Sequence, residues 1–324
     1  MSSRLKRQES VSQGLERLLR RELAAAIDAL HDAGETPEER VHIARRRLKR
    51  ARSFLVALAP AVGRRAERER RRIRDAARLL SATRDADVAV ETARALVLHA
   101  GPEAEAPLER LVAGLAARAT DGRNSHLPLD DATRTLARTA AAIDDFRVRG
   151  GDGDEELLID ALGDAYRDGR RAMARALRHP EAENVHAWRK LVKHRSHLTR
   201  AAGKRLAVAT PAVGAALDRL GDVLGDANDL AVLEAMVAQE PGLAGTPTEA
   251  AAVIALIAGR REVLKGQGFA LGEALFGVAP RRFRAALAAR TELLVPPAPS
   301  APAPMLGGGA MGLLSGRPPR ESEE

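Results

Sequence analysis

The sequence predicts an all-α protein, and three observations lead to that prediction. Aromatic residues make up only 2% of the 324 residues, and strand-forming residues are sparse and do not alternate with polar ones. Apolar residues instead recur at the three- and four-residue spacing of helices. A core built mostly of Ala, Leu and Val would let such helices pack closely.

The first half of the chain contains several helix signals. Apolar residues from Val11 to Leu30 recur at helical spacing, so residues 10–33 are expected to form a first helix. Thr36 and Pro37 have the residue types of a cap and a first turn, and we expect the helix that they begin to end at Pro60 or Gly63. Further helices are predicted over residues 64–80, from Ser81 to about residue 101, and over 104–119 and 129–147.

A glycine-rich segment, Arg149–Asp154, is the clearest internal break and predicts a flexible connection. Helices are expected beyond it over residues 155–178, from 180 onward, and over 211–226, 229–239, 248–265 and 267–294, with an interruption near Gly277–Pro280. The Pro- and Gly-rich residues 296–324 predict a disordered tail. Residues 1–295 would then form the domain, with halves at about 8–148 and 154–294.

Charge and cysteine content exclude some classes of function. The 52 Lys and Arg residues exceed the 44 Asp and Glu residues and cluster in acid-free runs. Such clusters predict an anionic partner, but composition alone does not distinguish this from merely solvated helix faces. The absence of cysteine excludes disulfides, thiol catalysis and Cys-ligated zinc. The N-terminus lacks an apolar signal core, and no apolar run approaches the ~20 residues of a membrane span. We therefore expect a cytoplasmic protein with no membrane partner.

One basic amphipathic segment, Val41–Leu55, is the strongest functional signal. Its apolar residues Val41, Ala44, Leu48, Ala51 and Leu55 fall on one side of a helix. The opposite side, here called the first-half basic face, consists of His42, Arg45, Arg46, Lys49 and Arg52.

The same arrangement recurs 144 residues later, in the segment Asn184–Leu198. There the second-half basic face consists of His186, Arg189, Lys190, Lys193, His197, Arg200 and Lys204, and the same acid-free runs also contain Arg195 and Arg205. The same offset aligns Leu80–Val88 with Leu224–Val232 without a gap, so that Asp85 matches Asp229. Two motifs in one register predict two related halves, a pair of helical bundles about a pseudo-two-fold axis. Facing basic faces would line one shared cleft suited to a long polyanion.

These paired motifs resemble the CHAD domain (conserved histidine α-helical domain) family. The pattern V-H-x-x-R-[RK]-x-[LV]-K occurs at Val41–Lys49 and Val185–Lys193, and L-[SG]-x-x-x-D occurs at Leu80–Asp85 and Leu224–Asp229. The resemblance covers roughly residues 8–294. It implies two pseudo-symmetric four-helix bundles around a basic central cavity that binds inorganic polyphosphate, and some family members associate with polyphosphate granules.

The resemblance also implies roles for particular residues. It assigns polyphosphate binding to His42, Arg45, Arg46, Lys49 and Arg52, and to His186, Arg189, Lys190 and Lys193. This chain departs from many members in having Asn228 in place of Arg or His, and Ser196 in place of Arg, so its second half is expected to make fewer contacts. The strands and the E-x-E-x-K signature of a fused triphosphate-hydrolase-type domain are missing.

Several alternatives remain open for individual residues. His42 and His186 are candidates for phosphate hydrogen bonding or for a structural imidazole, whereas metal binding is disfavoured because no His-x3-His pair with carboxylates occurs. Asp85 and Asp229 lack a nucleophile or metal partner for general-base work, so we expect them to cap a helix or orient a basic side chain, with a Mg²⁺ site as the minor alternative. Gly221 and Gly225 are expected to allow close helix packing.

The resulting prediction is a non-enzymatic polyphosphate-binding protein without a cofactor, at an expected cytoplasmic location that includes polyphosphate granules. Arg offers a planar fork for two phosphate oxygens, Lys a compact charge, and helical spacing places successive cations about 5–6 Å apart. Nucleic-acid or generic polyanion binding is the first alternative, although aromatic residues for base stacking are nearly absent. Action on phosphoanhydrides, directly or as an accessory to a hydrolysing enzyme, is the second.

Overall fold

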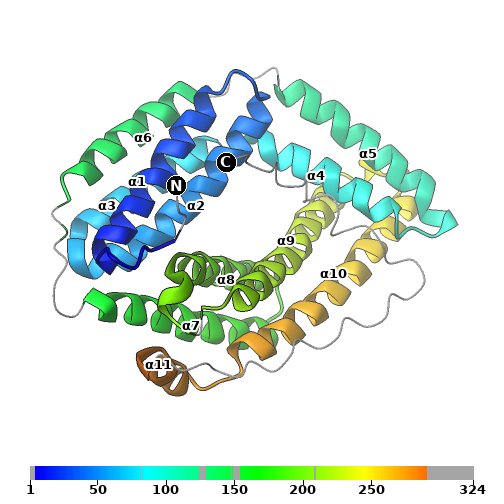
Figure 1. The fold of residues 1–324 in the computed structure, drawn as a ribbon. Coiled ribbons are helices and arrows are strands. Elements are labelled where there is room, and N and C mark those ends of the chain that lie inside the picture. Colours follow the sequence, from blue (N-terminus) through cyan, green and yellow to red (C-terminus); the bar gives the residue numbers. More distant parts are fainter. Residues whose placement is uncertain are drawn as a thin grey trace, which may run out of the picture.

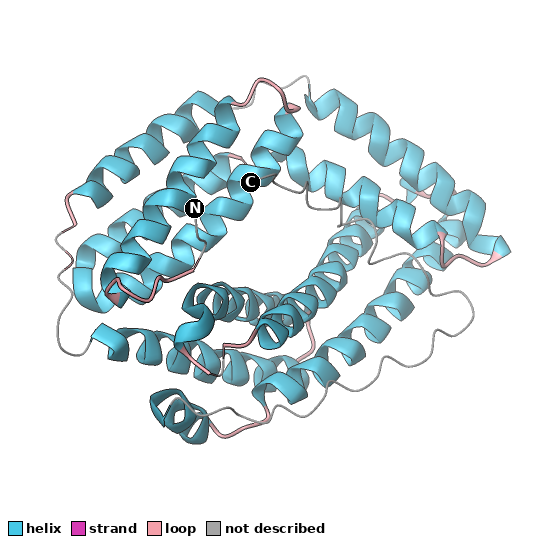
Figure 2. Ribbon diagram, in the orientation of Figure 1, coloured by secondary structure: helices cyan, strands magenta, loops and turns pink. Residues whose placement is uncertain are grey.

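The computed structural model describes residues 4–80, 82–123, 129–146, 148, 154–207 and 209–289, and these residues form an all-α fold (Figure 1). The predicted disordered tail at 296–324 lies outside the described residues. No strand occurs in the described part of the chain (Figure 2). The first six helices are α1 (Val11–His31), α2 (Pro37–Val62), α3 (Arg64–Leu79), α4 (Ala82–Val97), α5 (Pro102–Arg123) and α6 (Leu129–Asp144).

The remaining described helices belong to the second half of the chain. They are α7 (Asp154–Arg178), α8 (Ala182–Ala202), α9 (Pro211–Gln239), α10 (Pro247–Phe276) and α11 (Pro280–Ala289), with short 3-10 turns at Gly203–Arg205 and Pro241–Leu243. The predictions of two separate helices at 211–226 and 229–239, and of a break near residue 266, are wrong, because α9 and α10 run through both places. A glycine inside a helix costs only ~1 kcal/mol, which burial of the neighbouring side chains can offset.

The predicted start and end of α2 are confirmed. The Thr36 side chain accepts a hydrogen bond from the Glu39 amide at 3.3 Å, and Pro37 occupies the first turn. The helix passes through Pro60 and ends at Gly63, whose φ of 70° is accessible to glycine at little cost. These local signals were sufficient because they act within a few residues.

Two groups of buried apolar residues form the cores. The larger joins α1, α2, α3 and α6 to α7, α8 and α11, together with the first part of α9 and the last part of α10. The smaller consists of residues from α4, α5, the last part of α9 and the first part of α10. Each core therefore contains residues from both halves of the chain, and neither half has a core of its own.

Helices that match at the 144-residue offset also have matching neighbours. The pairs α1–α2 and α2–α3 pack together, as do α7–α8 and α8–α9. Contacts between the halves include α1 with α7, α2 with α8, α4 with α9, and α5 with α10. In Figure 1 the α4–α5 pair lies at the same end of the molecule as the last part of α9 and the first part of α10. Since each of these four contacts joins a helix to its own sequence equivalent, the packing is of the kind that a pseudo-two-fold arrangement predicts.

Candidate anion-binding site

The first-half basic face lies on α2. Arg46 and Lys49 are exposed, and His42, Arg45 and Arg52 are partly buried. Arg45 donates a hydrogen bond from Nη1 to the Ala77 carbonyl of α3 at 2.8 Å. The α2 helix places its apolar side in the core, as Val41, Ala44, Leu48, Ala51 and Leu55 are all buried, so the basic side chains are directed outward and toward α3.

The second-half basic face lies on α8 and makes an equivalent contact. Arg189 donates from Nε to the Gly221 carbonyl of α9 at 3.2 Å. Both residues of this pair lie 144 positions after Arg45 and Ala77, so the two motif arginines bond to the same place on the helix that follows them. Each of these arginines therefore joins its own helix to the next one, so the arginine of the pattern V-H-x-x-R has a structural role in both halves.

Two carboxylates of α9 neutralise part of the second-half basic face. Lys193 Nζ lies 2.7 Å from Asp222 Oδ1. Arg200 forms an ion pair with Asp218, and Ser196 donates its hydroxyl to the same carboxylate. Lys190 and Lys204 are exposed. Lys193 and Arg200, two predicted binding residues of this half, are thus paired with acidic side chains of another helix, which the pattern of α8 alone does not indicate.

The first-half basic face has arginines in the equivalent places. Arg74 and Arg78 of α3 occupy the positions that Asp218 and Asp222 occupy in α9. Burial, followed by the nearby charges of Arg70 and Arg74, lowers the pKa of Arg52. Like charges held this close favour the binding of an anion, because it would relieve their repulsion. Aligning α3 with α9 at the offset of 144 could have revealed this difference from the sequence alone.

Two glycines of α9 allow the basic side chains of α8 to lie along its backbone. A Cβ on Gly221 would be 2.5 Å from Lys193 Cε, and one on Gly225 would be 2.7 Å from Arg189 Nη2. The expectation that these glycines allow close packing is correct, but what packs there is a pair of cationic side chains. The matching position to Gly221 in the first half is Ala77.

The histidines differ in their surroundings. The pKa of His186 is lowered by burial and then by the charges of Lys190 and Arg189, while a hydrogen bond to the Asn228 side chain and the charge of Asp229 act in the opposite direction. His197 lies at the contact between α2 and α8, where its Nδ1 is 3.0 Å from the Ser53 hydroxyl. Burial, and then the charge of Arg50, lowers the pKa of His197 well below its usual range. Both imidazoles are therefore expected to be neutral at pH 7.

The second-motif carboxylate Asp229 does not cap a helix. Asp229 lies inside α9, so its predicted capping role is wrong. Its proximity to His186, together with a 3.3 Å contact from Asn228 Nδ2, fits the alternative role of orienting a side chain of the first motif. The pKa of neighbouring Asp226 is raised to about 6 by burial and then by the charges of Asp229 and Asp222. The Asp85 side chain lies outside the described residues.

Arg195 stabilises the core instead of joining the second-half basic face. It is only 3% exposed, and its guanidinium carbon lies 4.7, 4.6 and 5.1 Å from the ring centroids of Tyr166, Phe276 and Phe283. Its Nη1 donates to the Leu275 carbonyl at 2.8 Å, near the end of α10. Its position in an acid-free run of the sequence gave no signal of this role.

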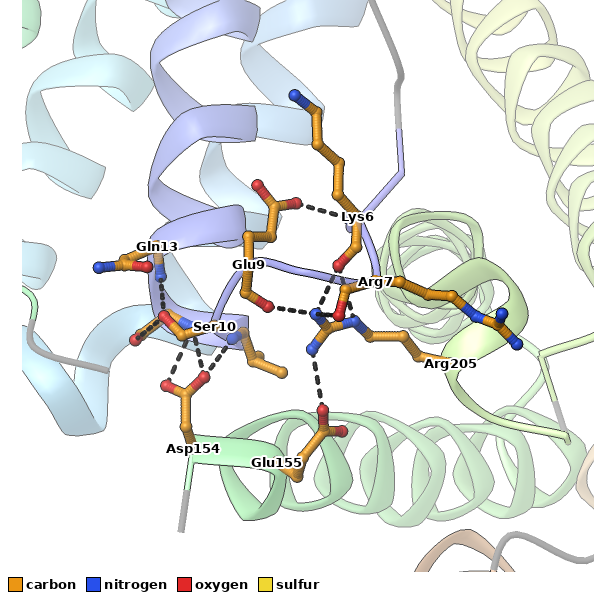
Figure 3. Close-up of polar contacts among 10 residues, drawn as sticks. Lys6, Arg7, Glu9, Ser10, Gln13, Asp154, Glu155 and Arg205 are labelled. Carbon is orange, nitrogen blue, oxygen red and sulfur yellow. Dashed lines mark hydrogen bonds and ion pairs between the residues drawn. The ribbon is translucent and has the colours of Figure 1, made fainter. Parts of the chain in front are cut away.

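Arg205 joins the N-terminal segment to the second half (Figure 3). Its guanidinium donates to the carbonyls of Lys6 and Glu9 and pairs with Glu155 at 2.8 Å. Next to it, Asp154 accepts hydrogen bonds from the first amides of α1, including that of Ser12 at 3.1 Å (Figure 3). This arginine is therefore a structural contact between the beginning of the chain and α7.

Among the described residues, no group of three or more His, Asp or Glu side chains is arranged to hold a metal ion. No helix in that part of the chain has the length and apolar character needed to cross a membrane. The site is thus defined by cationic side chains and by the carboxylates that oppose some of them.

The chain belongs to the CHAD domain family, because the family model matches residues 13–238. Its fold is similar to that in the crystal structure of the CHAD domain from the plant Ricinus communis, at a TM-score of 0.55 and 19% sequence identity, over 88% of this chain and 94% of the plant chain. At that identity the likeness concerns the fold. No curated protein matches the sequence.

Proposed function

We propose that this protein binds inorganic polyphosphate without hydrolysing it. The observation that supports this most is the row of Arg45, Lys49 and Arg52 on α2, packed beside a helix, α3, whose sequence contains Arg74 and Arg78. Membership of the CHAD family, which is linked to polyphosphate binding in general, agrees with this chemistry. Polyphosphate carries about one negative charge per unit, so a row of cations at helical spacing can contact several units of one chain.

The proposal includes a cavity between the halves that contains both basic faces, and a cytoplasmic location at polyphosphate granules. It includes no catalytic residue: the sequence offers a single motif carboxylate in each half, and no group of three or more His, Asp or Glu side chains among the described residues could hold a metal ion. A phosphate-release assay with Mg²⁺ tests this point, and turnover that disappears in Asp85→Ala would contradict it.

A binding titration with polyphosphate at several salt concentrations tests the main proposal. The expected result is tight binding that weakens steeply with salt, because each neutralised phosphate releases counterions. The variant Arg45→Glu/Lys49→Glu/Arg189→Glu/Lys193→Glu is expected to lose binding while its circular dichroism remains helical. Retained affinity in the folded variant would contradict the proposal.

Competition separates this function from nucleic-acid binding. Single-stranded DNA and polyphosphate are compared at equal charge concentration as competitors for labelled polyphosphate. We expect polyphosphate to compete far better, since the described residues contain few aromatic side chains for base stacking. Equal competition per charge would instead indicate a generic polyanion binder.

A further inference from the structure

The two halves differ in charge at many equivalent positions, and three of these pairs involve a residue of the first-half basic face or the partners of the second-half basic face on α9. Arg52, Arg74 and Arg78 of the first half correspond to Ser196, Asp218 and Asp222 of the second. In each pair an arginine is replaced by a neutral or acidic residue. The motif residues themselves remain cationic, since Arg45 and Lys49 correspond to Arg189 and Lys193.

In the second half the replaced residues bind the cations. Asp222 pairs with Lys193 at 2.7 Å, and Asp218 accepts from both Ser196 and Arg200. Because Gly221 has no side chain, Lys193 lies along α9, and its side chain is 27% exposed. An incoming phosphate would have to displace two carboxylates, which would then lie next to it and repel it.

In the first half, Arg74 and Arg78 stand at the positions where the second half has these two carboxylates. Ala77 replaces the glycine, so its Cβ occupies space equivalent to that of the Lys193 side chain, and Lys49 is exposed. The α3 carboxylates near these arginines pair with arginines of α3 itself: Glu67 with Arg70 and Arg71, Glu69 with Arg68 and Arg72, and Asp75 with Arg74.

We infer that the polyanion binds mainly along α2 and α3, and that Asp218 and Asp222 act as internal competitors that weaken the contribution of the second-half basic face to the site. This inference rests on the proposed function and makes it more specific. It assigns to two acidic residues a part in restricting polyanion binding, and to Arg74 and Arg78 a part in binding it.

Two variants of the full chain, each compared with wild type in a polyphosphate titration, test the asymmetry. Lys49→Gln/Arg52→Gln should weaken binding at least about tenfold. The charge-neutral variant Lys193→Gln/Arg200→Gln/Asp218→Asn/Asp222→Asn should lose several-fold less affinity than the first variant, because it removes two cations together with the two carboxylates that already pair with them. A loss in this variant as large as in the first would overturn the asymmetry while the proposed function stands.

A gain of binding gives an independent test. Asp218→Asn/Asp222→Asn should tighten polyphosphate binding about tenfold or more at low salt and steepen its salt dependence, because Lys193 and Arg200 become available. Its matched control is Asp160→Asn/Asp164→Asn, which removes two carboxylates of α7. Asp160 pairs with Arg284 of α11, and Asp164 pairs with Arg167 of α7. An equal gain in both would show an effect of net charge alone and would contradict the inference.

A third variant places the two carboxylates of the second half at the equivalent positions of the first half. Arg74→Asp/Arg78→Asp should reduce polyphosphate binding about a hundredfold while circular dichroism remains helical. Unchanged binding in this variant would overturn the role assigned to α3. If wild type shows no polyphosphate binding at all, the proposed function fails, and the asymmetry fails with it.

Discussion

Ser53 and His197 lie 144 residues apart in the sequence, and the Ser53 hydroxyl is 3.0 Å from His197 Nδ1. That separation equals the offset at which the two basic faces align, so each residue contacts its own equivalent. In a two-fold arrangement only residues on the axis do this. A pseudo-two-fold arrangement of the halves would therefore have its axis between α2 and α8 at this contact.

The first prediction concerns pH and two histidines of α8, His194 and His197. Burial lowers the pKa of His194 to about 4 and that of His197 well below its usual range. Above pH ~6.5 both are neutral in the folded and unfolded states, so they add no pH dependence. Below that pH the unfolded chain binds protons that the folded chain does not, and the free energy of unfolding should fall, by up to ~1.4 kcal/mol per pH unit for each histidine.

Urea unfolding between pH 7 and pH 5 measures this effect in wild type and in His194→Gln/His197→Gln. The variant should have the flatter pH dependence. Asp226, whose raised pKa of about 6 acts in the opposite direction between that pH and ~4, is present in both proteins and cancels in the comparison. Identical slopes would contradict the assignment of buried neutral imidazoles.

The sequence predicted helices well where local signals determine them and less well where long-range contacts do. Thr36 and Gly63 act on their own helix ends, and both ends were predicted. Asp229 and Gly266 resembled boundaries, but packing keeps α9 and α10 continuous there. For the site, the sequence pattern of α8 indicates its cations but not their partners on α9, because ion pairs such as Lys193 with Asp222 join separate helices.

The second prediction concerns Arg195. Its guanidinium fills the space between three aromatic rings and donates to the Leu275 carbonyl. Arg195→Ala should lower the free energy of unfolding by ~3 kcal/mol or more, because it leaves a cavity and an unsatisfied carbonyl. Arg195→Met should cost only ~1–2 kcal/mol, since its side chain still packs against the rings. Urea unfolding measures both, and equal losses in the two variants would contradict this division.

The third prediction concerns Arg205 and the N-terminal segment (Figure 3). The Arg205 side chain is 9% exposed and holds the carbonyls of Lys6 and Glu9, while the Leu5 amide donates to the Ala201 carbonyl at 2.8 Å. Arg205→Gln should speed hydrogen exchange of the Leu5 amide about 10- to 100-fold, equivalent to ~1.4–2.8 kcal/mol of local stability.

The control for Arg205 is Arg178→Gln, since the Arg178 hydrogen bond remains within its own helix. Exchange at Leu5 should be unchanged in this control. If Arg205→Gln also left it unchanged, the segment would be held by the Leu5–Ala201 bond and Asp154 without help from the guanidinium.

The last prediction contrasts two glycines whose added Cβ would meet different neighbours. On Gly169 it would lie 2.5 Å from Phe276 Cε1, in a fully buried ring that cannot move away, so Gly169→Ala should cost ~1–3 kcal/mol of unfolding free energy. On Gly221 it would meet the flexible end of Lys193 at the same distance, and alanine adds ~1 kcal/mol of helix preference. Gly221→Ala should therefore be neutral or stabilising in urea unfolding. A loss as large as that of Gly169→Ala would mean that the Lys193 side chain is fixed against α9, and that its pairing with Asp222 resists displacement more strongly than an exposed ion pair.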